Sequence, residues 1–395
     1  MFSNTEQTAD TVVDNRITAR RKVLASLLAG GGALVLTACG GGGSDSSNLD
    51  SVAERSRRRH GAGSSTPASS ASPASSASST TAANTSSGNN SGTSTAGTVL
   101  DTSFGVKGDG KTNDRAALQA AIDGSIGQIL LITGQSRIDA GGLDLRNNSH
   151  VRFAQGASIK LLPYKEESCE MIRLWDVSNV TLESPYLDGS KELNSATTGE
   201  WGMGISIQGA SNCTITSPTT INCWGDGIYI NNSYTNPSSG VTKNITINNH
   251  HASGCRRQGV SIISGDTITF NTPLWENISG TMPSCGLDIE PNDNNAVLKN
   301  INIVNPTTAN CAGGGIQIFM YNMPGPVSKT VSIAISGHTD TTSPVGSFVV
   351  EELFLEGYVV NGSITSTNPT WKYPLKLQNW DKGGPTVTAT GVKMA

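Results

Sequence analysis

Charged and aromatic residues are scarce in this chain: Asp, Glu, Lys and Arg make up 15% of its 395 residues, and Phe, Trp and Tyr make up 5%. The formal net charge is −4, so the chain lacks the basic surplus that a nucleic-acid partner requires. Ser-His-Asp spacing and phosphate-binding loops are absent too. Of the five histidines, only His250 and His251 are adjacent, and on a strand they would face opposite ways, which disfavours a metal site. Carboxylates remain as the candidate catalytic groups.

Short Cys-x-x-Cys pairs, which are typical of zinc sites, are also missing. Three of the seven cysteines stand four residues before a repeated glycine: Cys223, Cys255 and Cys311. Met282 takes the equivalent place in a further repeat. One apolar position repeated through a stack predicts a core column of buried thiols, with disulfides in an exported protein as the alternative. The pairing of the other domain cysteines is not predicted: Cys169, Cys213 and Cys285.

Residues 1–39 have the pattern of an export signal. Basic residues up to Lys22 precede an apolar run from Val23 to Val35. Leu36-Thr37-Ala38-Cys39 resembles a bacterial lipobox, which implies cleavage before Cys39 and its lipidation, and Arg20-Arg21 resembles a twin-arginine signal. We therefore expect an exported, membrane-anchored lipoprotein of the bacterial cell envelope that faces the periplasm or the cell exterior. An ordinary cleaved signal is the alternative.

Residues 40–97 have almost nothing to bury, because they are mostly Gly, Ser, Thr, Ala, Asn and Pro. This composition predicts a flexible tether. The rest of the chain, residues 98–395, is long enough for one large domain, with 19 Lys and Arg against 25 Asp and Glu, a net charge of −6. It is rich in glycine and shows no long helical pattern after residue 123, so we predict an all-β class.

Five glycines mark a repeat within this domain, at intervals of 23, 32, 27 and 29 residues: Gly204, Gly227, Gly259, Gly286 and Gly315. Each glycine is followed by an apolar, a variable and an apolar residue, which is the period-2 pattern of a strand with one buried face. A repeat of this length with one strand at a fixed place predicts a solenoid of stacked β-coils. At about 25 residues per turn, the domain would hold roughly ten to eleven coils.

The domain begins with a glycine-rich turn from Phe104 to Lys111, followed by helical spacing of apolar residues up to Ile122. This segment resembles the N-terminal motif of the pectate-lyase-like right-handed parallel β-helix superfamily, which includes rhamnogalacturonases, polygalacturonases, epimerases and phage tailspikes. The resemblance implies a right-handed, single-stranded parallel β-helix in which an N-terminal helix caps the first coil. A cap is also expected physically, because a solenoid end exposes unpaired strand edges.

A second resemblance concerns Asp226. The segment Gly225-Asp226-Gly227-Ile228 resembles a strand of polygalacturonase-like glycosidases in which the aspartate belongs to the catalytic carboxylates. This implies a catalytic role for Asp226. One coil later those enzymes carry Gly-His-Gly, where this chain has Arg257-Gln258-Gly259.

Counting from the repeated glycine shows which side chains stand above one another. Three residues before it stand Trp201, Trp224 and Arg256. An aromatic pair continued by a guanidinium is a candidate platform for a sugar, with the cation facing a uronate. The alternative is that the two tryptophans pack beneath a neighbouring loop.

Two acidic residues on one strand, Asp288 and Glu290, are expected to point outward with their backbones about 6.6 Å apart. Facing carboxylates at such a distance suit an inverting glycosidase, in which one protonates the leaving oxygen and the other activates water. Asp226, two coils away, would reach the same groove only from its edge. The alternative is that Asp288 and Glu290 cap a turn near Asn292 and Asp293.

These patterns lead to three hypotheses for an extracellular polysaccharide as partner. The first is a glycosidase without a cofactor, in which Asp226, Asp288 and Glu290 catalyse hydrolysis; the side chains that bind the sugar would be Trp201, Trp224, Tyr229, Arg256, Arg257 and Gln258. The second is a lyase or epimerase on a uronate polymer, with an arginine neutralising the substrate and Tyr229 or an arginine moving the proton. Calcium held by Asp288, Glu290 and Asp293 is conceivable in that case. The third is a non-catalytic, carbohydrate-binding or structural β-helix.

Overall fold

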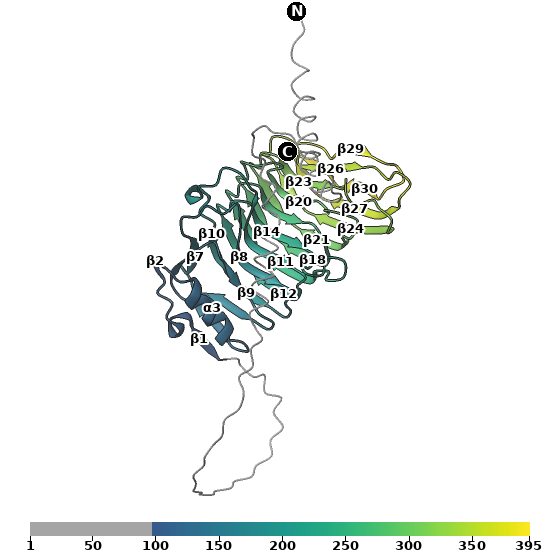
Figure 1. Cartoon of the computed structure of the whole chain (residues 1–395). Coiled ribbons are helices and arrows are strands. Elements are labelled where there is room, and N and C mark those ends of the chain that lie inside the picture. The colour runs from purple at the N-terminus through teal and green to yellow at the C-terminus, as the bar shows by residue number, and fades with distance from the viewer. Residues whose placement is uncertain (1–96) are drawn as a thin grey trace, which may run out of the picture. The chain divides into compact units, whose positions relative to one another are not determined.

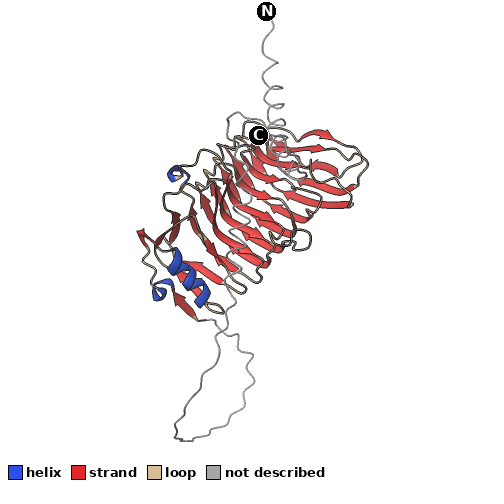
Figure 2. Ribbon diagram, viewed as in Figure 1, coloured by secondary structure: helices blue, strands red, loops and turns tan. Residues whose placement is uncertain are grey.

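Short parallel strands stack into three long sheets in the computed structural model, which describes residues 97–395 (Figures 1 and 2). The chain visits the sheets in turn, so each coil adds a strand to the sheets, and every pair of neighbouring strands is parallel. The predicted all-β parallel solenoid is confirmed. The predicted signal, the predicted lipidation residue Cys39 and the predicted tether up to residue 96 lie outside the described residues.

The strands of each sheet follow one another in chain order. Sheet A contains β1 (Thr98–Leu100), β3 (Ile129–Ile132), β6 (His150–Phe153), β9 (Thr181–Glu183), β12 (Ser211–Thr216), β15 (Lys243–Asn248), β18 (Gly265–Asn271), β21 (Leu298–Val304), β24 (Lys329–Ser336), β27 (Val360–Thr367) and β30 (Thr386–Thr390). Sheet B contains β2 (Asp109–Asn113), β4 (Gln135–Ile138), β7 (Ser158–Leu161), β10 (Tyr186–Asp188), β13 (Thr219–Ile221), β16 (His251–Ser253), β19 (Leu274–Glu276), β22 (Thr307–Ala309), β25 (Thr339–Asp340), β28 (Thr370–Trp371) and β31 (Lys393–Met394). Sheet C contains β5 (Leu143–Asp144), β8 (Ser168–Trp175), β11 (Trp201–Gln208), β14 (Asp226–Asn231), β17 (Gln258–Ile262), β20 (Cys285–Ile289), β23 (Gly314–Phe319), β26 (Phe348–Leu353) and β29 (Lys376–Trp380).

One α-helix, α3 (Arg115–Gly124), accompanies two short 3-10 helices, η1 (Asp101–Phe104) and η2 (Lys191–Leu193), within residues 97–395. It follows β2 and precedes β3, where later coils have a strand of sheet C, and it contacts β5, the end strand of that sheet. Its buried residues, Leu118, Ala121 and Ile122, belong to the hydrophobic core. No helix among the described residues is long and apolar enough to cross a membrane.

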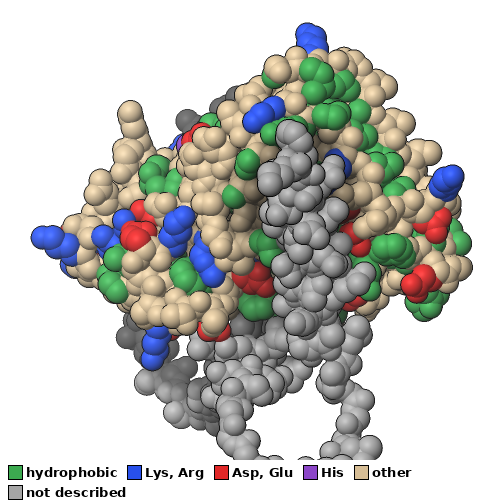
Figure 3. All heavy atoms as spheres, turned by 90° about the horizontal axis from the view of Figure 1, so that it is seen from above, with side chains coloured by type: hydrophobic (Ala, Val, Ile, Leu, Met, Phe, Trp, Pro, Cys, Tyr) green, Lys and Arg blue, Asp and Glu red, His purple; other side chains and the backbone are tan. Residues whose placement is uncertain are grey.

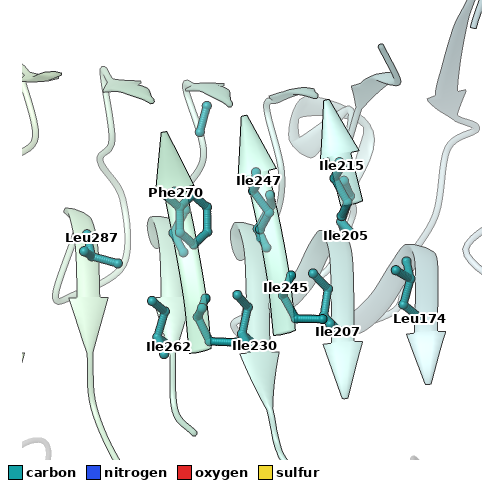
Figure 4. Close-up of a cluster of buried hydrophobic side chains, with 14 of the residues drawn as sticks. Leu174, Ile205, Ile207, Ile215, Ile230, Ile245, Ile247, Ile262, Phe270 and Leu287 are labelled. Atoms are coloured by element: carbon teal, nitrogen blue, oxygen red, sulfur yellow. The ribbon is translucent and has the colours of Figure 1, made fainter. Parts of the chain in front are cut away.

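The interior is built from columns of aliphatic side chains at matching places in successive coils. On sheet C, Ile207 pairs with Ile230 on the next strand, and both are fully buried. Figure 4 shows these side chains turned toward residues of sheet A such as Ile245 and Ile247. Each such side chain contributes about 1.5–3 kcal/mol by leaving water, so the apolar alternation that the sequence repeats supplies the main stabilisation of the solenoid.

The repeated glycines lie where the next coil and the side chains of sheet B come close to the backbone of sheet C. A Cβ atom at Gly227 would lie 2.6 Å from the carbonyl oxygen of Gly259 in the next coil, and it would also collide with Thr220 of sheet B. Gly259 meets the same restriction, because its Cβ would lie 2.5 Å from the carbonyl oxygen of Gly286. Real Cβ atoms do not come this close, so close approach between sheets B and C explains the glycine repeat.

The predicted column of buried thiols is confirmed for three residues, which are buried and unbridged: Cys223, Cys255 and Cys311. The prediction for Met282 is wrong, because its side chain is 43% exposed. Ile278 takes the place instead: its carbonyl accepts from Ala312, as the carbonyl of Cys255 accepts from Ser279. The segment between Ile278 and β20 is longer than in the other coils, so counting backwards from Gly286 overshoots the column.

Candidate functional site

Polar side chains on the outer face of sheet C contact one another across neighbouring coils. Asp226, which begins β14, accepts a hydrogen bond from Ser261 Oγ of β17 at 2.8 Å. One coil on, the amide of Gln258 repeats this contact by donating from Nε2 to Asp288 Oδ2 at 3.0 Å. Gln258 Oε1 also accepts from the backbone N–H of Cys285 at 2.8 Å. The same two strand positions are thus linked in successive coils, which fixes the orientation of both aspartates.

Arg257 joins three carboxylates that come from separate coils. Its Nη1 lies 3.2 Å from Asp226 Oδ2, its Nη2 lies 3.5 Å from Glu290 Oε2, and its Nε lies 3.2 Å from Glu200 Oε2. Nη1 also donates to Ser261 Oγ at 3.3 Å. We call these five residues the Arg257 cluster. Within the cluster, Asp226 is fully buried, whereas Glu200 and Glu290 are partly exposed.

Burial and charge set the protonation of the cluster. Desolvation raises the pKa of Asp226 to about 6, although Arg257 and the Ser261 hydroxyl act in the opposite direction. The guanidinium of Arg257 loses hydration, but its carboxylate partners outweigh this and raise its pKa, so it stays charged. Burial also raises the pKa of Tyr229 to about 12. Asp226 is therefore a carboxyl group that exchanges its proton near neutral pH.

Asp288 and Glu290 do not form the exposed, facing pair that their strand spacing suggests. Asp288 is 1% exposed and accepts from Gln258, whereas Glu290 contacts Arg257. The link through Arg257 instead connects Glu290 with Asp226, which was expected only at the edge of the groove. No group of three His, Cys, Asp or Glu side chains that could hold a metal ion is found within residues 97–395, and calcium at Asp288, Glu290 and Asp293 stays a prediction.

The expected column of Trp201, Trp224 and Arg256 is only partly accessible. The guanidinium carbon of Arg256 lies 3.9 Å from the ring centroid of Trp224, as the column predicts, but it covers that ring, which is buried. Arg256 Nη1 also donates to the carbonyl oxygen of Gly199 at 2.7 Å. Trp201 is 41% exposed. A sugar platform made of both tryptophans is therefore not present, and Trp201 alone remains available.

Three residues near the cluster are not predicted by the sequence repeat. Glu200 precedes β11, and the matching position in later coils holds buried cysteines, so the repeat does not mark it as polar. Trp175 ends β8, whose coil lacks the repeated glycine. Tyr234 lies in the loop after β14 and stacks with Trp175 at a centroid distance of 6.4 Å.

Inside the solenoid, two histidines are held neutral by matching partners. The side chains are Thr220, His250 and Trp275 in one group and Thr308, His338 and Trp371 in the other, and we call them the Thr-His-Trp triads. In each, the indole N–H donates to histidine Nδ1, at 3.1 and 2.9 Å, and histidine Nε2 lies 2.8 Å from the threonine hydroxyl. Burial lowers the pKa of both histidines to about 3. Their saturated hydrogen bonding makes them structural residues.

Sequence comparisons find a partial relative of this chain. No protein-family model matches this chain. A stretch of 214 residues is 25% identical to the uncharacterized protein YclG of Bacillus subtilis, and it covers 47% of this chain and 37% of that relative. The chain thus matches little more than a third of the relative's length.

Solved structures resemble the chain at low sequence identity. The N-terminal fragment of bacteriophage phi29 gene product 12 has a TM-score of 0.56 at 16% identity and covers 75% of this chain and 53% of its own. A tailspike protein of E. coli bacteriophage HK620, solved in complex with a hexasaccharide, has a TM-score of 0.52 at 11% identity, with coverages of 72% and 53%. The A-module of mannuronan C-5 epimerase AlgE4 from Azotobacter vinelandii gives 0.49 at 16% identity, with coverages of 75% and 95%. The phage structures with TM-scores above 0.5 support the parallel β-helix fold of this chain.

Proposed function

We propose that this protein acts on a polysaccharide at the Arg257 cluster and that its reaction is glycoside hydrolysis. The observation that carries the proposal is the presence of three carboxylates around one guanidinium, with the pKa of Asp226 raised to about 6. A glycosidase needs one carboxyl group that is protonated near the working pH and a second that is ionised. The tailspike neighbour, whose structure holds a hexasaccharide, supports a carbohydrate partner.

In this proposal, Asp226 is the general acid and Glu290 the general base. Asp226 would protonate the glycosidic oxygen, and the partly exposed Glu290 would accept a proton from the attacking water. Because Asp226 lies beneath Arg257, the substrate must displace the guanidinium from it. The ion pair between Glu200 and Arg257 Nε would then hold the arginine side chain at the site. Asp288, for which the strand spacing suggests a catalytic role, is better suited to hold Gln258 in place.

Non-catalytic binding of a polysaccharide is the second candidate, and the burial of Asp226 and Asp288 favours it. A lyase or epimerase acting on a uronate polymer has less support. The nitrogens of Arg257 already contact Glu200, Asp226 and Glu290, so this arginine is not available for a substrate carboxylate. The raised pKa of Tyr229 also makes it a poor base.

One assay distinguishes these reactions. The purified protein is incubated with a panel of neutral and acidic polysaccharides, and reducing ends are followed together with the absorbance of unsaturated uronates. Reducing ends alone support hydrolysis. Both signals together indicate a lyase, an altered uronate configuration without chain cleavage indicates an epimerase, and binding without any product indicates the non-catalytic candidate.

Export and lipid attachment are further parts of the proposal, and they rest on the sequence of residues 1–39. We propose that a signal peptide is removed before Cys39, that this cysteine carries the lipid, and that residues 40–97 tether the β-helix to the envelope. Labelling cells with a fatty acid should mark the wild-type protein and leave Cys39→Ser unmarked. We also propose that α3 serves as the cap of the first coil, which its contact with β5 supports.

A further inference from the structure

An aromatic pair stands on one side of the Arg257 cluster, where strands of sheet C end. Trp175, the last residue of β8, stacks on Tyr234 with 19° between the ring planes. The indole N–H of Trp175 donates to Ser206 Oγ at 2.9 Å, which holds the ring in place. Tyr234 is 40% exposed. This side of the cluster thus offers a fixed apolar surface with an accessible phenol ring.

A second aromatic group stands on the other side. Phe319 is the last residue of β23, and its ring centroid lies 6.3 Å from that of Tyr321. Tyr321 in turn meets Phe354 at 6.1 Å with an edge-to-face angle of 80°. Tyr321 and Phe354 are 38% and 39% exposed. Both aromatic groups therefore present apolar faces to a ligand.

Strand register places Trp175, Glu290 of the cluster and Phe319 on one line along the solenoid. Trp175 is the register partner of Gln208, which is the partner of Asn231. Further along, Glu290 and Phe319 each follow a paired isoleucine, Ile289 and Ile318, on neighbouring strands. From β8 to β23 there are five strand spacings, or about 24 Å. Amides and a carboxylate thus lie between the aromatic groups, as in sites that bind sugar hydroxyls and ring faces.

The charge along this line is unfavourable for an anionic polymer. Within the cluster, three carboxylates face one guanidinium. Two further arginines are already engaged: Arg256 lies over Trp224, and Arg173 is buried and paired with Asp144. On the face of the described chain drawn in Figure 3, Lys and Arg side chains are spread out, and several of them lie beside Asp or Glu. A uronate polymer would bring a negative charge with each sugar to a site that is already acidic.

We propose that the ligand is a neutral polysaccharide that lies along this line, with its sugar rings on Tyr234 at one end and on Tyr321 at the other. This proposal rests on the proposed function, because it names the substrate class of the same site. Aromatic rings bind the apolar faces of neutral sugars without requiring charge. The carboxylates and amides between them accept and donate hydrogen bonds to sugar hydroxyls.

The test is a binding panel at low ionic strength. Neutral polymers (a glucan, a galactan, a mannan and a xylan) are compared with two acidic polymers, polygalacturonate and alginate. Polygalacturonate whose carboxyl groups are fully methyl-esterified is included as an uncharged form of the first acidic polymer. We expect binding to at least one neutral polymer and at least about tenfold weaker binding to every acidic one. Preference for an acidic polymer overturns the neutral substrate class but leaves polysaccharide binding intact. Failure to bind any polymer overturns the proposed function as well.

Two variants test the line itself. Tyr234→Ala and Tyr321→Ala each remove an exposed ring and should weaken binding of the neutral polymer by about fivefold to tenfold. Tyr186→Ala is the matched control, because Tyr186 is a tyrosine of similar exposure, 42%, on β10 of sheet B. Equal losses in all three variants, or no loss in the first two, would show that the polymer does not lie on this line. Circular dichroism confirms that each variant is folded.

Discussion

The outer face of sheet C and the interior next to sheet B both bury polar side chains, but the two regions balance them differently. In the Thr-His-Trp triads, each ring nitrogen of a neutral histidine has one partner, and in the second triad the Thr308 hydroxyl also donates to the buried Asp340 at 2.6 Å. In the Arg257 cluster, acidic groups outnumber the single base, and the fully buried Asp226 has a raised pKa. A buried polar group that is neutral and saturated is explained by folding alone. Unbalanced charge beside solvent costs stability and therefore points to function.

Removing the carboxyl groups of the cluster should have the largest effect. We expect Asp226→Asn and Glu290→Gln each to lower the rate of polysaccharide hydrolysis by about 10²–10⁴-fold, since each removes a proton-transfer group. The wild-type rate should fall above about pH 6, because the acid Asp226 loses its proton there. The measurement is initial rates of reducing-end release from pH 4 to 9.

Thr308→Val is the control for these variants, since it removes a hydroxyl from a triad and not from the cluster. It should leave the rate and the pH profile unchanged. Full activity in Glu290→Gln would contradict a catalytic role for the Arg257 cluster. The cluster would then be a structural ion-pair network.

Acid should distinguish the two regions by the sign of their effects on stability. The folded pKa of His250 and of His338 is about 3, below the unfolded value of about 6.5, so the unfolded chain binds more protons and the free energy of unfolding falls below pH 6.5. At pH 5 each histidine should cost about 2 kcal/mol relative to pH 7.5. The folded pKa of Asp226 is raised to about 6, so its protonation acts in the opposite direction. It should raise the free energy of unfolding at pH 5 by about 1.4 kcal/mol relative to pH 7.5.

Chemical unfolding at pH 7.5 and pH 5 measures both contributions. The wild-type protein should lose about 3 kcal/mol between these pH values from these three groups, and Asp226→Asn should lose about 4 kcal/mol. A loss in Asp226→Asn that is equal to or smaller than that of the wild type would contradict the raised pKa of Asp226.

Gly227 separates the two regions, because it follows Asp226 on β14 and its missing Cβ would collide with Thr220 of a triad. We expect Gly227→Ala to lower the free energy of unfolding by about 3 kcal/mol, as for other overpacked cores. Urea unfolding is the measurement. Gly383→Ala is the control: its Cβ would meet a side-chain atom of Leu355 at 3.2 Å, and its effect should stay within about 0.5 kcal/mol. Equal stability of the two variants would show that close packing does not require the repeated glycine.

Much of the fold could be predicted because successive coils repeat the same sequence pattern. The repeated glycines Gly227, Gly259 and Gly286 lie on consecutive strands of sheet C, β14, β17 and β20, as the repeat predicts. Period-2 alternation and the glycine spacing are local signals, and stacking repeats them.

The site was less predictable because its contacts do not follow the repeat. Register correctly aligned Asp226 with Gln258. It gave no information on the reach of Arg257, whose long side chain contacts acids from three other coils, or on Glu200, which comes from an irregular segment. The triads were missed for another reason: the glycine repeat marks strands of sheet C, whereas His250 and Trp275 meet at neighbouring places of adjacent coils on sheet B.

The smallest expected effect tests where the interior column of thiols runs. Ile278 is fully buried at the place between Cys255 and Cys311, so Ile278→Val should cost about 1 kcal/mol of unfolding free energy. Met282→Ala removes more atoms, but the side chain is 43% exposed, so its cost should stay below about 0.5 kcal/mol. If Met282→Ala lost more unfolding free energy than Ile278→Val, Met282 and not Ile278 would occupy the interior column. The buried positions of this coil would then be displaced along the chain relative to its outer face. Such a shift would also misplace Gln258 and Asp288, because both lie in coils whose register depends on this segment.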